Sequence, residues 1–170
     1  VDPANRGRVG NTALVAGPRG AVVGGGGVSR RQGVALLAAA RQNESDPVRA
    51  LLITPVRQEF VLGAPAFQEA GVPVVMHPAA ARLMRARCDN CLKNLKRELG
   101  AQEMAGSRVV TPDRLLEAGD PWLAEVTGRP LRLLTFGVQA HSSGPGDVAL
   151  LDEAVHAIQD VFVEKNVTLP

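Results

Sequence analysis

The chain has 170 residues and a mass of 17.8 kDa, which is long enough for one domain with its own core and excludes both a small disulfide-stabilised protein and a multidomain array. Hydrophobic residues make up 45% of the sequence, and no run reaches the roughly 18 apolar residues of a membrane helix, so we expect no membrane insertion. The net charge of +2 and an aromatic content of 3% give no signal for a nucleic-acid partner.

Apolar runs and turn residues predict that strands and helices alternate through the first hundred residues, as in an α/β domain. The turn Gly17-Pro18-Arg19-Gly20 joins the first two strands as a hairpin, and Ser29 with Gln32 has the spacing of a helix capping box. Gly100 is a natural helix stop. The predicted strands are 13–16, 21–23, 50–54 and 72–76, and the predicted helices are 30–42, 64–70, 79–87 and 91–99.

From Arg108 onward the sequence predicts a β-rich second half. Its strand-like segments are 109–110, 131–134, 148–151 and 158–163, separated by turns rich in Gly and Asp. We find no internal repeat and no linker, so residues 1–170 are expected to form one domain. The start, Val1-Asp2-Pro3, has no basic or apolar leader, so we expect any targeting peptide to have been removed or to lie outside this chain.

The four glycines Gly24 to Gly27 stand between a predicted strand and a predicted helix, where backbone amides can cradle a phosphate. Their spacing fits neither G-x-G-x-x-G nor the P-loop pattern, because Ser29 or Arg30 falls at the last glycine position. Nucleotide binding is therefore disfavoured.

The three histidines, His77, His141 and His156, form no ligand pair in the sequence. His141 is the most suggestive, because it lies in a turn of small residues that would leave its imidazole exposed. A serine-hydrolase triad assembled from Ser142 or Ser143 with His156 and Asp160 is disfavoured, because the nucleophile elbow G-x-S-x-G is missing.

Cys88 and Cys91 are the two cysteines and form a single C-x-x-C motif. A redox role would need a thiol of low pKa, which the start of a helix beginning near Asn90 and its basic neighbours could supply. The alternative is a buried or disulfide-bonded pair, and the sequence leaves both open. The surrounding basic residues could face an acidic partner, but most such runs are solvated helix faces. They are Arg82, Arg85, Arg87, Lys93, Lys96 and Arg97.

The order of these elements resembles the metallo-β-lactamase fold over nearly all of the chain. The resemblance is carried by residues 5–12, the hairpin, the tract Val-Val-Gly-Gly-Gly-Gly-Val-Ser, and Leu51-Leu52-Ile53-Thr54. Residues 60–67 and 71–78 are most similar to the zinc-metallohydrolase branch associated with quinoprotein systems. The resemblance implies an αββα sandwich.

The metal motif of this family, H-x-H-x-D-H, should follow Thr54, but the corresponding positions carry Pro55, Arg57, Glu59 and Phe60. Only Glu59 could bind a metal, whereas a dinuclear site needs several imidazoles and a carboxylate around a water. The acidic residue that normally ends the second strand is also missing, and its position falls near Gly25.

Further along the chain, the resemblance assigns His141 to the third histidine ligand and Asp160 to the bridging aspartate. The family normally continues through further strands and helices to a last histidine ligand, whereas this sequence ends ten residues after Asp160. Either this sequence is a fragment or the protein lacks part of the second half of the fold.

Two functions follow from the resemblance. The first is a non-catalytic protein that has lost its dinuclear site and binds or assembles a protein partner, such as a redox enzyme, without a cofactor. The second is a residual hydrolase with one weakly held zinc or other divalent metal at His141, Asp160 and Glu59. A third, independent hypothesis is thiol redox chemistry at Cys88 and Cys91. The quinoprotein resemblance favours the periplasm, and neither the partner nor the oligomeric state follows from the sequence.

The resemblance also places residues 55 to 60 at the mouth between the two sheets, where a pocket is expected. Arg57 and Glu59 there could form an ion pair that replaces the metal as a local stabilising contact.

Overall fold

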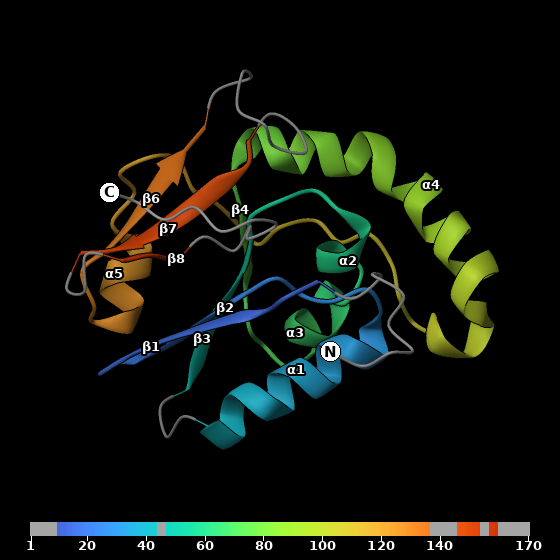
Figure 1. The fold of residues 1–170 in the computed structure, drawn as a ribbon, viewed down its shortest axis with the longest axis horizontal. Coiled ribbons are helices and arrows are strands. Elements are labelled where there is room, and N and C mark those ends of the chain that lie inside the picture. Colours follow the sequence, from blue (N-terminus) through green and yellow to red (C-terminus); the bar gives the residue numbers. More distant parts are fainter. Residues whose placement is uncertain (1–9, 44–46, 137–145, 154–156, 160–170) are drawn as a thin grey trace.

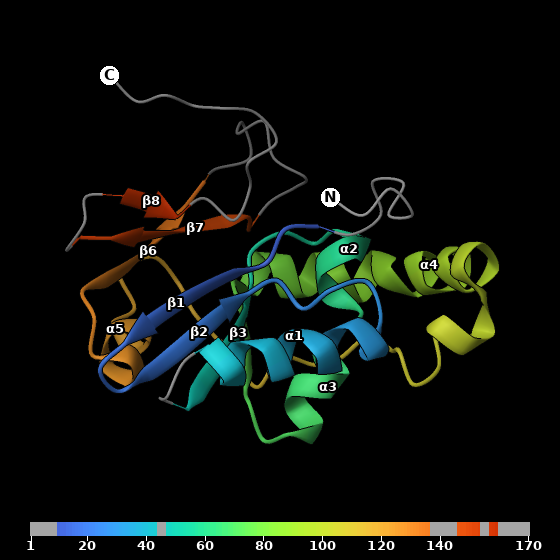
Figure 2. The same cartoon turned by 60° about the horizontal axis from the view of Figure 1, so that its bottom comes forward.

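The computed structural model describes residues 10–43, 47–136, 146–153 and 157–159. These residues form three layers, with a five-stranded sheet in the middle (Figure 1). Helices α1 (Arg30–Asn43) and α3 (Ala64–Glu69) cover one face of this sheet, and a three-stranded sheet covers the other face, as Figure 2 shows. The observed architecture matches the predicted α/β class.

The central sheet has the strand order β1-β2-β3-β4-β5. The first two strands pair antiparallel across a two-residue turn, Pro18-Arg19, and the following strands pair parallel to their neighbours. The bounds are β1 Ala13–Gly17, β2 Gly20–Gly24, β3 Val48–Ile53, β4 Val74–Met76 and β5 Arg114–Leu115.

Strand β3 is buried on both faces, as its continuous apolar run predicts. Leu51 and Ile53 pack into the core beneath the helices, whereas Ala50 and Leu52 face the core shared with the second sheet. Because side chains alternate along a strand, one short segment of sequence joins both cores.

The helix layer is completed by α2 (Gln58–Val61) and by α4 (Pro78–Glu103), which has 26 residues. Met84, Cys88 and Leu95 lie at helical spacing along α4 and are buried against the first core. His77 caps the start of α4, since its Nδ1 accepts a 3.2 Å hydrogen bond from the amide of Ala79.

The second sheet contains β6 (Leu131–Thr135), β7 (Val148–Asp152) and β8 (Ala157–Gln159), all antiparallel, and helix α5 (Trp122–Thr127) precedes it. Its inward side chains, including Leu133 and Leu150, pack against Leu52 and Val75 of the central sheet. This second apolar core holds the two sheets face to face.

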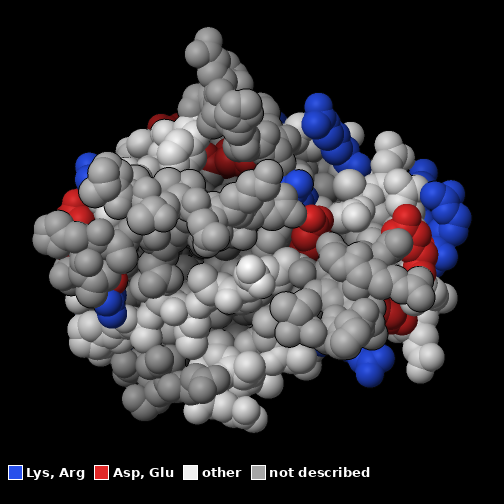
Figure 3. Space-filling view, in the orientation of Figure 1, with Lys and Arg blue, Asp and Glu red and all other residues white. Residues whose placement is uncertain are grey.

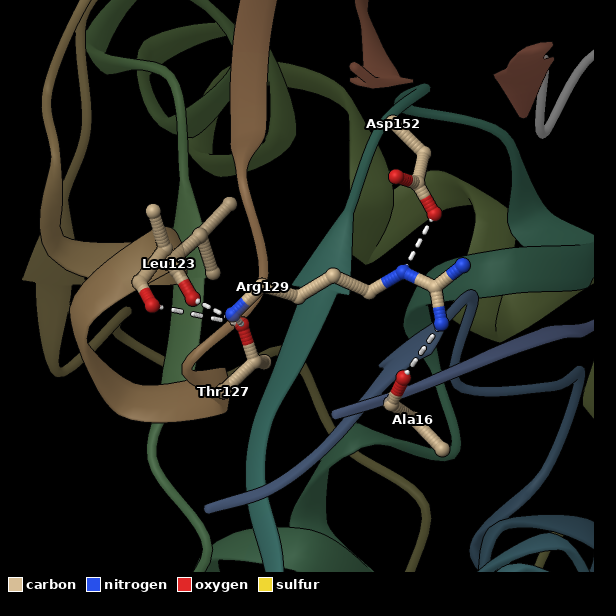
Figure 4. Close-up of polar contacts among 6 residues, drawn as sticks. Ala16, Leu123, Thr127, Arg129 and Asp152 are labelled. Atoms are coloured by element: carbon tan, nitrogen blue, oxygen red, sulfur yellow. Dashed lines mark hydrogen bonds and ion pairs between the residues drawn. The ribbon is translucent and has the colours of Figure 1, made fainter. Parts of the chain in front are cut away.

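A polar contact ties the end of the middle strand of the second sheet to the edge strand of the central sheet (Figure 4). Arg129, which follows α5, forms an ion pair with the buried carboxylate of Asp152 at the end of β7. The same guanidinium donates a 2.9 Å hydrogen bond to the carbonyl of Ala16 in β1. One side chain therefore contacts both the second sheet and the edge strand of the central sheet, while the backbone amide of Arg129 lies 3.3 Å from the hydroxyl of Thr127 at the end of α5.

The structure differs from the predicted elements in several places. Residues 79–87 and 91–99 were expected to be separate helices, but they lie within α4, whose regular backbone is interrupted only at Gly100, with φ of 86°. Residues 109–110 are not a strand, and the short helices α2 and α5 were not expected. Of the predicted strand 158–163, residues 158 and 159 belong to β8, and residues 160–163 lie outside the described residues.

Within the described ranges, no helix combines the length and the apolar character that crossing a membrane requires.

Candidate functional site

The candidate site lies where the parallel strands β2, β3 and β4 end at one edge of the central sheet. Two segments with unusual sequence meet there: the glycine tract that follows β2, and residues 54–60 that follow β3. The carboxyl edge of parallel strands is the usual position for a site in an α/β fold, because the connecting loops converge there. The resemblance places its metal motif in the second of these segments.

The glycine tract uses its amides inside the protein. The amide of Gly25 donates to the carbonyl of Leu52 at 2.9 Å, and the amide of Gly26 donates to the carbonyl of Phe60 at 2.7 Å. The carbonyl of Gly27 accepts from the amide of Gly63 at 3.0 Å. Amides held in this way cannot cradle a phosphate, which agrees with the unfavourable spacing of the glycines.

Close packing of backbones explains these glycines instead. A Cβ on Gly63 would lie 1.9 Å from the carbonyl oxygen of Gly26, and a Cβ on Gly33 would lie 2.2 Å from that of Gly63. Only hydrogen fits at such distances. The glycines therefore let α1, the tract and the start of α3 approach one another directly.

The aromatic ring of Phe60 packs onto the glycine tract. A Cβ built on Gly25 would lie 2.8 Å from a ring carbon of Phe60, and one on Gly10 would lie 2.3 Å from the ring. Phe60 itself is buried, with 7% of its surface exposed. Any side chain at position 25 would therefore overlap the ring.

Glu59 and Arg57 precede Phe60 in the sequence, and the described residues show no ion pair between them. Glu59 is in the first turn of α2 and is partly buried, and Arg57 is the exposed residue just before that helix. The described residues include no ion pair between the two, so the predicted salt bridge in place of a metal is not observed.

Residues 146–148, which follow His141 in the sequence, lie at the same edge. The amide of Val148, at the start of β7, lies 3.4 Å from the carbonyl of the fully buried Thr54. Gly146 lies against the first turn of α4, where its Cβ would be 2.3 Å from the amide nitrogen of Ala80. His141 and Asp160 themselves lie outside the described residues. Among the described residues, no three His, Cys, Asp or Glu side chains are grouped so that they could hold a metal ion.

Cys88 and Cys91 lie one turn apart in the middle of α4, and both are free thiols. Cys88 is fully buried, and this burial, followed by the neighbouring Cys91, raises the pKa of its thiol to about 12. Because α4 begins at Pro78, no helix start lies near Asn90 to lower a thiol pKa. The structure thus removes the physical basis given for a reactive thiol at Cys88.

A cavity of about 300 Å³ lies between α4 and the extended segment 109–112. Its walls combine apolar groups with the charged side chains of Arg85 and Asp89. The sequence pattern could not reveal this cavity, because its two sides are brought together only by the turn after α4. The apolar lining residues are Ala81, Met84, Val109, Val110 and Pro112.

No protein-family model matches this sequence, and no curated protein matches it. Solved structures do match. A metallo-β-lactamase from Pontibacter korlensis has a TM-score of 0.59 and 19% identity, over 83% of this chain and 54% of that chain. One from Hirschia baltica has a TM-score of 0.59 and 15% identity, over 85% of this chain and 55% of that chain. The metallo-β-lactamase FIM-1 from Pseudomonas aeruginosa, in its mono-zinc form, has a TM-score of 0.60 and 11% identity, over 83% of this chain and 52% of that chain.

The chain thus spans about half the length of the structures that it matches. The layers of helices, central sheet and second sheet, together with these matches, show the architecture that the sequence predicted. The chain has the fold of the metallo-β-lactamases.

Proposed function

We propose that this protein is a non-catalytic member of the metallo-β-lactamase fold that binds a protein partner. The observation that carries the proposal is the contact between Phe60 and Gly25. The resemblance assigns a metal-binding histidine to position 60 and places the missing acidic residue near position 25. An aromatic ring packed on a glycine stands where two polar groups would be needed.

The donor set of the described residues does not fit zinc. Zinc in proteins is held by imidazole, thiolate or carboxylate groups, commonly three or four of them. Of the four positions that correspond to the metal motif, only Glu59 carries such a group, while the neighbouring guanidinium of Arg57 repels a cation. The residues at these four positions therefore do not form a zinc site.

The packing suggests that this edge is stabilised by apolar contact instead. Burying an aromatic ring contributes on the order of 2 to 3 kcal/mol, and the glycines admit the ring without overlap. The fold then remains stable without a metal and can present its outer surfaces to another protein. Following the resemblance to the quinoprotein-associated branch, we propose a component of a periplasmic redox enzyme complex as the partner.

Metal content tests the first half of the proposal. The protein is purified without chelator, and zinc, iron and manganese are measured by elemental analysis alongside His141→Ala and Glu59→Ala. We expect far less than one metal ion per chain, with no difference between the variants. Near-stoichiometric metal that is lost in His141→Ala would overturn the proposal and indicate the residual hydrolase.

Co-purification tests the second half. The tagged chain is purified from its own cells at low and high salt, and the associated proteins are quantified against the chain. A partner in near-stoichiometric amount is the expected result. A chain that elutes alone under both conditions would contradict a role in partner binding.

A further inference from the structure

The outer face of α4 carries a stripe of basic side chains. At 3.6 residues per turn, its six charged positions fall within an arc of about 120°, opposite the buried face that contains Met84 and Cys88. All six are exposed, and the stripe is about 22 Å long at 1.5 Å per residue. The stripe comprises Arg82, Arg85, Asp89, Lys93, Lys96 and Arg97. Figure 3 shows blue Lys and Arg atoms along the right edge of the molecule, where Figure 1 places α4.

This stripe concentrates the positive charge of the protein. Its five cations and one carboxylate give a net charge of +4, whereas the whole chain carries only +2. The rest of the chain is therefore net negative. Such an asymmetric distribution attracts an anionic partner to one face and orients it there.

The fold does not use these cations internally. Elsewhere on the surface, Arg30 and Arg108 both form ion pairs with Glu69, at 2.7 Å and 3.1 Å. In the described part of the chain, no ion pair involves any basic residue of the stripe, and Arg97 only donates a hydrogen bond to the side chain of Asn94. An outside group can therefore pair with them without breaking an ion pair of the fold.

The cavity between α4 and residues 109–112 opens next to the stripe. Arg85 and Asp89 belong to both, and the remaining walls are mainly apolar. Binding energy in protein interfaces is concentrated where a side chain fills such a pocket beside charged groups. The stripe and the cavity together thus offer charge pairing and an anchoring point on one face.

We propose that this face binds an acidic segment of a partner protein, with carboxylates on the basic stripe and one apolar side chain in the cavity. This inference rests on the proposed function as a partner-binding protein and assigns the surface that performs it. A protein fits better than nucleic acid, because Asp89 lies within the stripe. It would repel the phosphates that a nucleic acid places at every repeat, whereas a protein segment can place its apolar side chain rather than a carboxylate beside Asp89 at the cavity. An apolar side chain that could enter the cavity likewise has no counterpart on a phosphate chain.

A labelled peptide tests the proposal by fluorescence anisotropy at low salt. The probe has about eight residues, enough to span the stripe at ~3.3 Å per residue, with Glu and Asp around a central Leu. We expect saturable binding that weakens at least tenfold when Leu is replaced by Ser or when the protein carries Arg85→Glu with Lys96→Glu. Thr111→Trp, which fills the cavity from an exposed position, should weaken binding by a similar factor.

The matched control is Arg41→Glu, which reverses an exposed cation on α1, away from the stripe, and should leave binding within twofold of the unmodified protein. Circular dichroism verifies that each variant folds. The proposal would be overturned if Arg41→Glu lost as much affinity for the peptide as the stripe variant, or if the Leu to Ser exchange in the peptide had no effect. Tighter binding to duplex DNA or to phosphatidylserine vesicles than to the peptide would also overturn it.

The co-purified partner separates this inference from the proposed function. Loss of that partner in the Arg85→Glu, Lys96→Glu variant supports both. Retention of the partner by this variant would overturn the assigned surface and leave the scaffold role standing. Stoichiometric metal would instead overturn the non-catalytic role, whichever peptide result is obtained.

Discussion

The hydroxyl of Ser29, at the start of α1, donates a 2.6 Å hydrogen bond to the carboxylate of Glu103, the last residue of α4. The same hydroxyl oxygen accepts a 3.0 Å hydrogen bond from the amide of Gln32. One fully buried side chain therefore caps its own helix and holds the far end of another. The contact joins the start of α1 to the segment of α4 that follows the break at Gly100.

Ser29→Ala is expected to lower the free energy of unfolding by about 1 to 2 kcal/mol, because it removes the helix cap. Loss of the contact with Glu103 adds to this cost. The measurement is the urea midpoint at constant m-value. Glu103→Gln, which keeps an acceptor oxygen, is the control and should cost less. In the double variant Ser29→Ala, Glu103→Ala, which removes the contact from both sides, the loss of stability should fall short of the sum of the two single losses, and full additivity would show that the contact does not stabilise the fold.

Local sequence rules predicted one part of this arrangement and not the other. The spacing of Ser29 and Gln32 predicted the cap, although the Gln32 side chain accepts from the amide of Val28 rather than from that of Ser29. The contact with Glu103 joins positions 74 residues apart, so no local pattern contains it. In the same way, the predicted helix break between residues 87 and 91 rested on local composition. The core contacts of Cys88 and Leu95 instead favour one continuous helix.

The candidate site shows the same division. The sequence identified the unusual positions 25 and 60, because they lack the residues that the resemblance requires. It could not show that Phe60 fills the space above Gly25, since that contact depends on how α2 follows β3. His141 and Asp160 remain predictions.

Gly25→Ala should destabilise the protein more than Gly71→Ala. Both glycines have positive φ, 88° and 76°, so a side chain brings backbone strain of about 1 to 3 kcal/mol at either position. Gly71 has open space around it, whereas a Cβ at Gly25 meets the ring of Phe60. The expected difference is about 1 to 3 kcal/mol in thermal or urea unfolding, as for other overpacked cores.

A second substitution tests whether the ring causes this difference. Phe60→Leu in the Gly25→Ala background should recover part of the lost stability, because the smaller side chain leaves room for the methyl group. Equal destabilisation by Gly25→Ala and Gly71→Ala would show that the contact with Phe60 is unimportant.

The thiols of Cys88 and Cys91 should differ strongly in reactivity. The pKa of the Cys88 thiol is raised to about 12, mainly by burial. At a pH of about 8.5, where an ordinary cysteine is half ionised, almost none of Cys88 is therefore thiolate. With a disulfide reagent under these conditions, we expect one fast thiol per chain, which disappears in Cys91→Ser, and a second thiol only after unfolding. Fast reaction of Cys88 in the folded Cys91→Ser variant would restore the redox hypothesis.

Glu69 should contribute to acid sensitivity. Hydrogen bonds from Arg30 and then Arg108 lower the pKa of its carboxyl below the ordinary value. Because the folded pKa is the lower one, the stabilisation is present above the ordinary pKa and is lost as the pH falls through the folded value. Glu69→Gln should therefore lose stability at neutral pH but little at strongly acid pH. The difference between the two proteins, measured by urea unfolding across this range, should shrink on acidification and would contradict this account if it grew.

Arg129 should matter more to stability than its partner Asp152. Arg129→Met leaves a carboxylate that is only 2% exposed without its guanidinium, and it also removes the hydrogen bond to the carbonyl of Ala16. We expect a loss of about 3 to 5 kcal/mol, the usual cost of breaking a buried pair. Asp152→Asn should cost less, because the Arg129 side chain is 32% exposed and can reach water.

The control is Arg132→Met, which breaks the ion pair between Arg132 and Glu153. The side chain of Arg132 is 54% exposed and that of Glu153 is 50% exposed. An exposed pair contributes about 0 to 1 kcal/mol, so this change should hardly move the urea midpoint. Similar costs for Arg129→Met and Arg132→Met would mean that the contact between the two sheets is held by the apolar core alone. A large cost confined to Arg129→Met would show that this one guanidinium fixes the second sheet against the edge of the first.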